Sequence, residues 1–182
     1  EVILHLYARS HKERLEDAIS ASLTKLMGAF SLLFLTKDSL VAARDPWGFR
    51  PLSMGRLPNG GYAVASETCA LSTLGCSEID EVRPGEIVTL QGAEMRRHQA
   101  LTPAAQSSRC TFEFVYFSRP DSVWDGRSIH AVRQRLGEEL APLPKPSVNA
   151  ASTRDNLILA ANGEIASIDG FYPSLLAKIS GE

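Results

Sequence analysis

The stretch from Gly28 to Leu90 decides the fold of this chain, and it opens with the apolar run Ala29-Phe30-Ser31-Leu32-Leu33-Phe34-Leu35. The polar pair Lys37-Asp38 separates this run from a second one, Leu40-Val41-Ala42-Ala43. Two short apolar runs joined by a few polar residues predict an antiparallel hairpin. A run of this length is too short for a free-standing helix and too apolar for a half-solvated strand. We therefore expect residues 29–35 to form a central strand with both faces covered.

Further strands are expected downstream. The run Tyr62-Ala63-Val64-Ala65-Ser66 predicts a third strand. Residues 81–90 and 94–99 predict a second hairpin around Gln91-Gly92, and Pro84-Gly85 supplies a turn. Residues 110–117 are also expected to form a strand, with Phe112, Phe114 and Tyr116 on one face and Glu113, Val115 and Phe117 on the other.

Helical spacing of apolar residues predicts an amphipathic helix over residues 11–27 that ends at Gly28. A short helical turn is expected over residues 69–74, with Ser66 near its start. Ser128 is the expected N-cap of a last helix. The apolar positions that mark the two longer helices are Leu15, Ile19, Leu23 and Leu26, and then Ile129, Val132, Leu136 and Leu140.

The composition is that of an ordinary globular domain, with 182 residues, 44% hydrophobic and 22% charged. A net charge of −2 gives no electrostatic reason to expect binding to nucleic acid or to an anionic membrane. No apolar run approaches the length of a membrane span. Three cysteines, without a Cys-x-x-Cys pair, argue against a disulfide framework and favour a reducing compartment.

Several motifs carry a family resemblance. They are Arg44-Asp45-Pro46-x-Gly48-x-Arg50-Pro51, Ala65-Ser66-Glu67 and Val82-x-Pro84-Gly85-Glu86. These motifs resemble the glutaminase domain of class II glutamine amidotransferases. The segment Cys110-Thr111-Phe112-Glu113-Phe114-Val115-Tyr116-Phe117-Ser118-Arg119-Pro120-Asp121-Ser122, followed by Arg133-x-x-Leu136-Gly137-Glu138, is similar to the amidophosphoribosyltransferases in particular. Asparagine synthetases share only a looser form of the first two motifs.

The resemblance implies an α+β fold, a partial four-layer αββα N-terminal-nucleophile hydrolase with two stacked, mainly antiparallel sheets. It implies that residues 1–127 are the back part of the glutaminase domain. Residues 128–141 would be a linker helix toward a phosphoribosyltransferase domain. Residues 142–182, which begin with the Pro-rich segment Pro142-Leu143-Pro144-Lys145-Pro146, match no motif of the family and stay unassigned.

The family's reaction is the first committed step of purine synthesis, in which glutamine and phosphoribosyl pyrophosphate give phosphoribosylamine. Its glutaminase half uses an N-terminal cysteine whose own α-amine is the general base. Position one is Glu1 here, so the chain is expected to be a fragment that is inactive by itself. The resemblance implies glutamine and phosphoribosyl pyrophosphate as substrates of the parent enzyme, and a homo-oligomer as its assembly.

The residues around Arg44 are the first candidates for a site. Two arginines beside Asp45 could bind a carboxylate or a phosphate, or they could hold the loop together by hydrogen bonds. Gly48 is suited to a positive φ. The resemblance favours the second role. It implies that Arg44, Asp45, Gly48, Arg50, Ser66 and Glu67 support the neighbouring active site without touching substrate.

Cys110 is the one cysteine that the resemblance singles out. In some members of the family a cysteine just before this segment is one of four thiolate ligands of an iron–sulfur cluster. Cys110 is therefore either such a ligand in the parent enzyme or an ordinary structural thiol. We expect no cofactor in this chain, and magnesium in the parent enzyme.

Two other hypotheses stay open. The chain could be a non-catalytic truncated paralogue that acts as a structural or interaction module, because an incomplete sheet leaves edges open to partners. It could also be a misassembled gene product with no stable fold. The expected compartment is the cytoplasm, or a plastid for a plant source.

Overall fold

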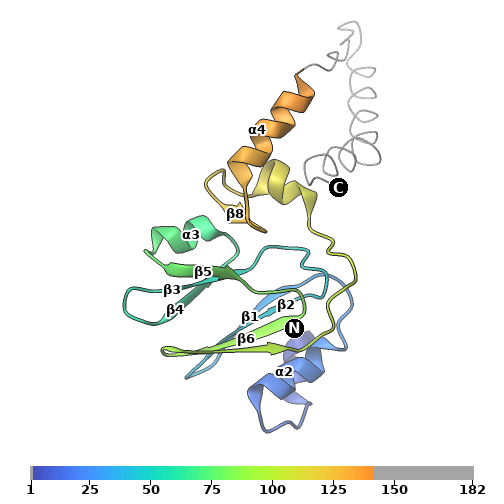
Figure 1. Cartoon of the computed structure of the whole chain (residues 1–182). Coiled ribbons are helices and arrows are strands. Elements are labelled where there is room, and N and C mark those ends of the chain that lie inside the picture. Colours follow the sequence, from blue (N-terminus) through green and yellow to red (C-terminus); the bar gives the residue numbers. More distant parts are fainter. Residues whose placement is uncertain (1, 142–182) are drawn as a thin grey trace, which may run out of the picture.

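The computed structural model of the chain describes residues 2–141 (Figure 1). Two antiparallel sheets form its centre. The first has the strand order β1-β2-β6-β7, and the second has the order β4-β3-β5. The strands of the first sheet are β1 (Ser31–Leu35), β2 (Leu40–Arg44), β6 (Glu86–Gln91) and β7 (Glu94–Gln99). Those of the second are β3 (Ser53–Arg56), β4 (Tyr62–Ala65) and β5 (Ser77–Glu81).

The two sheets pack face to face through one apolar core. Because side chains alternate along a strand, Ala42 on β2 and Val88 on β6 point toward the second sheet. They meet Met54 on β3 and Val82, which follows β5, and all four residues are buried. This core fixes the spacing between the sheets and confirms that they are stacked.

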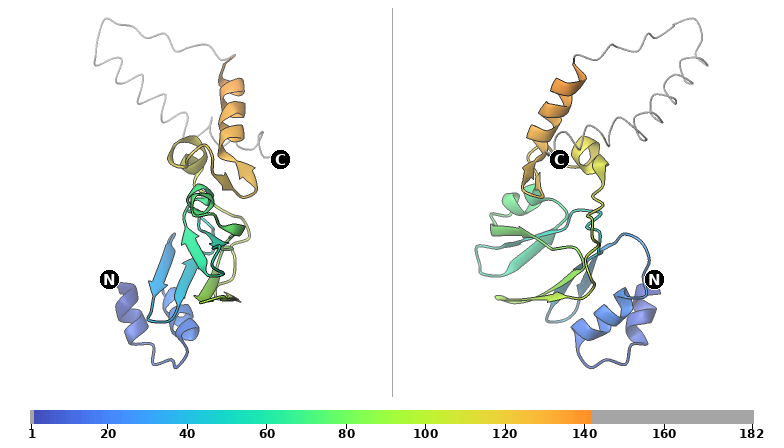
Figure 2. Two further views of the ribbon diagram at one scale, coloured as in Figure 1. Left: turned by 90° about the vertical axis from the view of Figure 1, so that its left-hand side faces the viewer. Right: turned by 45° about the vertical axis from the view of Figure 1, so that its right-hand side comes forward.

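Helices cover the two outer faces. Helix α2 (Leu15–Leu23) places Ile19 and Leu23 against Val41 and Ile87 on the outer face of the first sheet. Helix α1 (Val2–Ala8) packs beside α2 (Figure 2). Helix α3 (Thr68–Thr73) packs on the second sheet. The order helix, sheet, sheet, helix confirms the expected α+β architecture of four layers.

A further apolar core, separate from the one between the sheets and from the contact below α2, lies beyond the sheets. It joins a π-helix, η1 (Glu113–Phe117), to α4 (Ile129–Leu140) and to the two-stranded ribbon of β8 (Val123–Trp124) and β9 (Arg127–Ser128). Phe114 stacks on Trp124 with ring centroids 4.8 Å apart, and Val132 and Leu136 of α4 complete the cluster. Ser128 caps α4 as expected, since its hydroxyl accepts the N–H of Ala131 at 3.4 Å.

The structure contradicts the strand expected over residues 110–117. This segment is helical, and the N–H of Ser118 donates to the carbonyl of Glu113. Of the three aromatic side chains expected on one face, Phe114 is buried, whereas Phe112 and Tyr116 are 48% and 76% exposed. No neighbouring strand among the described residues pairs with the segment, so packing of Phe114 decides its conformation over β-propensity.

Three boundary predictions also need correction. Only residues 31–35 of the expected strand form β1, which lies at the edge of the described sheet, and Leu35 is 83% exposed, so one face of this strand is not covered. The helix expected over residues 11–27 is shorter, since His11 has a φ of +50° and α2 ends at Leu23. Glu67, rather than Ser66, occupies the N-cap position of α3. The hairpin around Gln91-Gly92 is confirmed.

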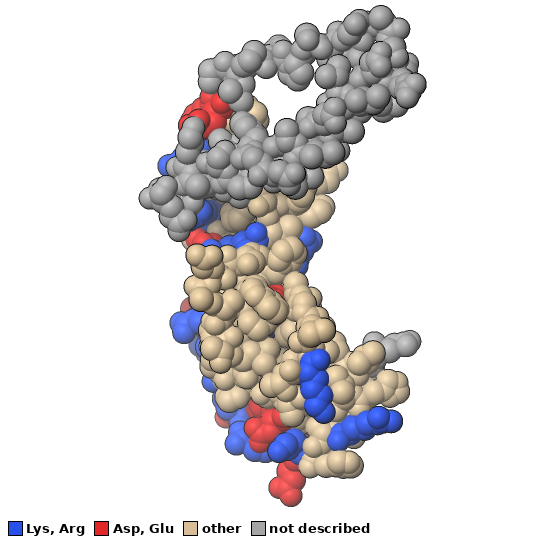
Figure 3. Space-filling model, turned by 90° about the vertical axis from the view of Figure 1, so that its right-hand side faces the viewer, with Lys and Arg blue, Asp and Glu red and all other residues tan. Residues whose placement is uncertain are grey.

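Charged side chains of both signs are spread over the surface. Figure 3 shows one face on which charged side chains lie at the lower end and again at the upper end of the described part, whereas the middle is largely uncharged. Among residues 2–141, no helix is long and apolar enough to cross a membrane.

Candidate functional site

The loop that follows β2 is organised by the carboxylate of Asp45. Asp45 is fully buried. Its Oδ1 accepts the N–H groups of Trp47 at 2.9 Å and Phe49 at 3.3 Å, and its Oδ2 accepts the N–H of Phe30 at 3.2 Å. Because an ionised carboxylate binds N–H groups strongly, this one side chain fixes the path of the loop relative to β1.

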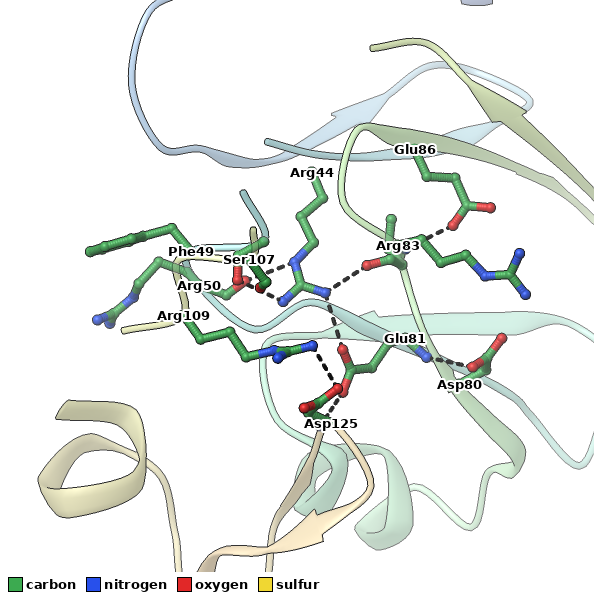
Figure 4. A network of polar contacts seen from close by, with 12 residues as sticks. Arg44, Phe49, Arg50, Asp80, Glu81, Arg83, Glu86, Ser107, Arg109 and Asp125 are labelled. Carbon is green, nitrogen blue, oxygen red and sulfur yellow. Dashed lines mark hydrogen bonds and ion pairs between the residues drawn. The ribbon is translucent and has the colours of Figure 1, made fainter. Parts of the chain in front are cut away.

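Arg44 joins the loop to the second sheet (Figure 4). Its side chain is 2% exposed. Nε donates to the carbonyl of Arg50 at 3.0 Å, and Nη2 donates to that of Gly48 at 3.2 Å. Nη1 donates to the carbonyl of Val82 at 2.7 Å and pairs with Oε2 of Glu81 at 3.1 Å. Most of its N–H donors are thus taken by the protein, so the geometry favours a structural role over ion binding.

Gly48 has the positive φ expected from the sequence, +64°. A Cβ at this position would lie 2.9 Å from Cγ of Pro84, closer than side chains approach one another. Glycine therefore lets the loop approach the turn after β5 and keeps the carbonyl of Gly48 within reach of Arg44.

The polar network continues from Arg44 toward the β8–β9 ribbon. Glu81 accepts the backbone N–H of Asp125 through Oε1, and Oδ1 of Asp125 pairs with Nη2 of Arg109 at 2.6 Å. A cavity of about 450 Å³ lies beside this network. It is lined by Thr68, Ile79, Asp80, Glu81, Arg83, Pro84, Arg109, Val123, Asp125 and Gly126.

Sequence reasoning missed Glu81, Asp125 and Arg109. Asp125 and Gly126 have φ of +54° and +69°, so the Asp-Gly pair was a detectable turn signal. Glu81 lies 37 residues from Arg44 along the chain, and nothing local distinguishes it from a solvated charge. Another missed residue is Arg97 on β7, which pairs with Asp80 of the second sheet and, at 3.2 Å, with Glu86.

Arg50 extends away from Arg44 and has a different environment (Figure 4). Its Nη2 pairs with Oε1 of buried Glu113 at 3.0 Å. Its guanidinium lies over the ring of Phe117, 4.9 Å from the centroid. Its Nη1 also lies 3.6 Å from Sγ of Cys110. Arg50 therefore connects the loop to η1.

Cys110 is buried, and its Sγ lies 3.6 Å from Nη1 of Arg50. An iron–sulfur cluster nevertheless takes four cysteine thiolates. Among the described residues, no group of three or more His, Cys, Asp or Glu side chains could hold a metal ion. These residues by themselves do not fit a cluster.

Glu67 connects α3 to the turn before β8. Its Oε2 accepts the N–H of Arg119 and the hydroxyl of Ser122, both at 2.7 Å. The same oxygen lies 3.8 Å from Sγ of Cys69. Ser66, by contrast, is exposed at the end of β4. The structure thus brings Arg44, Asp45, Gly48 and Arg50 together, and it holds Glu67 in a separate contact.

The described residues offer no clear cysteine nucleophile. Cys69 is buried beside Glu67, whose carboxylate is already engaged by two donors. Cys76 is half-buried, and Cys110 is buried next to a cation rather than a base. A thiol nucleophile needs an adjacent general base or a lowered pKa together with access to substrate.

Comparisons with known proteins agree on one family. A family model described as a glutamine amidotransferase domain matches residues 1–73. Amidophosphoribosyltransferase 1, chloroplastic, of Arabidopsis thaliana is 45% identical over 141 residues, which cover 78% of this chain and 25% of the relative. The amidophosphoribosyltransferase of Staphylococcus aureus strain Mu50 is 38% identical over 173 residues, 94% of this chain and 33% of the relative.

Solved structures give the same result. The glutamine phosphoribosylpyrophosphate amidotransferase of B. subtilis, complexed with ADP and GMP, has a TM-score of 0.70 at 38% identity. An allosteric regulatory enzyme of purine biosynthesis has a TM-score of 0.71 at 39% identity. Each match covers 81% of this chain and 31% of the solved chain. The chain therefore spans about a quarter to a third of the relatives that it matches.

Proposed function

This chain belongs to the amidophosphoribosyltransferase family as a segment of its glutamine amidotransferase domain, and from this premise we propose that it is the scaffold part of that domain. The enzyme reaction would be the first committed step of purine synthesis, from glutamine and phosphoribosyl pyrophosphate to phosphoribosylamine. The supporting observation is that the family motif around Arg44 and Asp45 is buried and hydrogen-bonded within the protein. These residues support a neighbouring site rather than bind substrate.

This geometry suits a supporting role for this chain, separate from the chemistry of the catalytic cysteine. In class II glutaminases a cysteine thiolate attacks the amide, and an oxyanion hole stabilises the tetrahedral intermediate while ammonia leaves. This chain would contribute the rigid double sheet behind that site. Arg44 and Asp45 would hold the loop in place, and Glu67 would hold the connection toward α4.

Cofactor, partners and compartment are part of the same proposal. The parent enzyme would take magnesium with phosphoribosyl pyrophosphate and would assemble as a homo-oligomer, whereas this chain would hold no cofactor of its own. Cys110 would serve here as a structural thiol beside Arg50. The compartment would be the cytoplasm, or a plastid for a plant source, since the Arabidopsis relatives are named chloroplastic.

A glutaminase assay of the purified chain tests the proposal that this chain by itself supports the site but does not hydrolyse glutamine. Glutamate release from glutamine is measured, with the full-length S. aureus relative as the positive control. We expect release at the level of the enzyme-free blank, because no cysteine among the described residues has a free base beside it. Release above the blank that disappears in Cys69→Ser, Cys76→Ser or Cys110→Ser would overturn the proposal.

One observation favours a second candidate function, that of a non-catalytic module. Strand β1 has an open edge in the described sheet, which another polypeptide could extend. The gene sequence upstream of Glu1 separates the candidates. An in-frame Met-Cys-Gly-Ile type start supports the enzyme, and its absence supports the module.

A further inference from the structure

Motifs that lie far apart in the sequence meet at the π-helix η1. Arg50 belongs to the motif that follows β2, and Arg133 belongs to the motif in α4. Both side chains contact η1, which itself lies within the motif of residues 110–122. What these separate motifs share in the folded chain is therefore contact with one short helix.

The wide turn of η1 is closed by a double contact between Glu113 and Ser118. The N–H of Ser118 donates to the carbonyl of Glu113 at 3.1 Å, and the hydroxyl of Ser118 donates to Oε2 of Glu113 at 2.7 Å. A bond across five residues is the pattern of a π-helix, which is rare and often lies at functional sites. Both side chains are buried, so the carboxylate of Glu113 helps to hold this turn from within the protein.

The buried charge of Glu113 is paired with Arg50. The side chain of Glu113 is 5% exposed, and its Oε1 lies 3.0 Å from Nη2 of Arg50. Among the described residues, Arg50 is the one cation that pairs with this carboxylate. A buried carboxylate without a partner is strongly unfavourable. The position of η1 therefore depends on where the loop after β2 places Arg50.

Arg133 of α4 binds η1 through two main-chain carbonyls. Its Nε donates to the carbonyl of Phe114 at 2.8 Å, and its Nη2 donates to that of Ser118 at 2.6 Å. The last carbonyls of a helix have no partner within it, so Arg133 satisfies groups that η1 leaves open. Helix α4 is thus tied to η1 by hydrogen bonds as well as by the apolar cluster around Phe114.

Helix α4 packs on η1 and on the ribbon rather than on the sheets. Among the described residues, its main contacts are with η1 and β9. Figure 1 shows α4 pointing away from both sheets. Its direction relative to the double sheet is therefore set by how η1 and the ribbon are held.

We propose that Arg50, Glu113, Ser118 and Arg133 are positioning residues that form one clamp on η1 and so set the direction of α4 relative to the double sheet. The consequence for catalysis rests on the proposed function. There, α4 is the helix expected to lead toward the phosphoribosyltransferase domain. The clamp would hold the amidotransferase part in the orientation that the glutamine-dependent reaction needs.

Amide hydrogen exchange of the full 182-residue chain tests the clamp. Arg50→Gln removes the charge that pairs with Glu113, and the 43% exposure of the Arg50 side chain favours a folded variant. Exchange in η1 and α4 is expected to be about tenfold faster, whereas exchange in β6 should stay unchanged. Arg50→Lys keeps the positive charge beside Glu113 and should restore most of the protection.

A matched control lies on the same segment. Asp121→Asn removes the charge from an ion pair with Arg119, whose two side chains are 66% and 56% exposed. Because this pair lies outside the clamp, exchange in α4 should equal that of the unchanged chain. Glu113→Gln should affect the same segments as Arg50→Gln, and the double variant should be no faster than the single ones, since both changes break one contact.

A rate measurement tests the consequence for catalysis. In a chimera, residues 1–141 would replace the aligned segment of the S. aureus amidophosphoribosyltransferase. Arg50→Gln should lower glutamine-dependent pyrophosphate release about tenfold and leave the ammonia-dependent rate unchanged. A chimera with the unchanged segment that is inactive with glutamine would contradict the proposed function, whereas exchange in the chain by itself decides on the clamp.

Three results would overturn the proposal. The first is unchanged exchange in η1 and α4 of Arg50→Gln. The second is equal acceleration in every segment, β6 included, because it would reduce Arg50 to a contributor to global stability. The third is an Arg50→Lys variant that exchanges as fast as Arg50→Gln. Equal losses of the glutamine-dependent and ammonia-dependent rates would refute the consequence for catalysis.

Discussion

Replacement of Arg44 by methionine perturbs the contact that joins the loop after β2 to the second sheet. The Arg44 side chain is 2% exposed. It donates to Glu81 and to the carbonyls of Val82, Gly48 and Arg50 at 2.7–3.2 Å. Methionine is long enough to fill part of the space but donates no hydrogen bond. Arg44→Met therefore leaves three carbonyl oxygens and one carboxylate without this partner.

The expected cost follows from the burial of these groups. Removal of one partner from a buried ion pair costs roughly 3–5 kcal/mol, and an orphaned buried acceptor costs about 1–3 kcal/mol. The side chain of Glu81 is 26% exposed, so water reaches its carboxylate and moderates the loss. We expect a decrease of about 4 kcal/mol in the free energy of unfolding, a large share of the usual 5–15 kcal/mol. For a chain of this size, Tm should fall by roughly 8–16 °C.

Urea unfolding followed by circular dichroism measures this loss. The matched control is Arg56→Met, since Nη1 of Arg56 lies 3.9 Å from Glu78 and the two side chains are 42% and 69% exposed. An exposed pair of this kind contributes below about 1 kcal/mol. If the free energies of unfolding of Arg44→Met and Arg56→Met agree within about 1 kcal/mol, the role assigned to Arg44 is refuted.

Three further predictions concern other parts of the structure. Glu67→Gln should weaken the hydrogen bond from Ser122, destabilise the protein by about 1–2 kcal/mol and speed amide exchange in residues 119–122, and unchanged exchange would contradict this. Gly85→Ala should cost more than about 3 kcal/mol, because φ is +75° and a Cβ would overlap the backbone carbonyl of Leu101, which follows β7. Gly92→Ala, with a φ of +57° and open space, should cost about 1–2 kcal/mol, and equal losses for the two variants would count against this reasoning. The pKa of half-buried Glu16 is lowered from 4.5 by its backbone hydrogen bond and then by a nearby arginine. Its contribution to stability is thus present above the unfolded-state pKa and lost as pH falls through the folded-state pKa, so Glu16→Gln should flatten the acid dependence of Tm, and an unchanged slope would argue against it.

Local patterns in the sequence predicted the elements whose partners lie nearby in the chain. The hairpins β1–β2 and β6–β7 are joined by short turns, and apolar runs mark β1, β2 and β6. The N-cap Ser128 is also a local signal, because its hydroxyl bonds three residues ahead. The prediction that the two sheets stack came from the family resemblance rather than from hydrophobic periodicity.

The wrong predictions concern segments whose structure depends on packing against residues that are distant in the sequence. An apolar run does not reveal whether a further strand covers it, and β1 is an edge strand within the described sheet. Alternating aromatics over residues 112–116 resemble a strand, yet the packing of Phe114 on Trp124 fixes a π-helix.

In the candidate site too, local contacts could be predicted from the sequence and distant contacts could not. The sequence correctly predicted that Asp45 and Arg44 hold their own loop by hydrogen bonds. It missed Glu81, whose two partners are 37 and 44 residues away. Whether these residues support an active site stays a prediction.

Exchange of this segment into a relative tests the central claim most directly. Residues 1–141 would replace the aligned segment of the S. aureus amidophosphoribosyltransferase, and pyrophosphate release from phosphoribosyl pyrophosphate would be measured with glutamine or ammonia as the nitrogen donor. If these residues are the scaffold of the amidotransferase domain, the glutamine-dependent rate should stay within about tenfold of that of the parent enzyme. A folded chimera that keeps the ammonia-dependent rate but loses the glutamine-dependent rate would contradict the account.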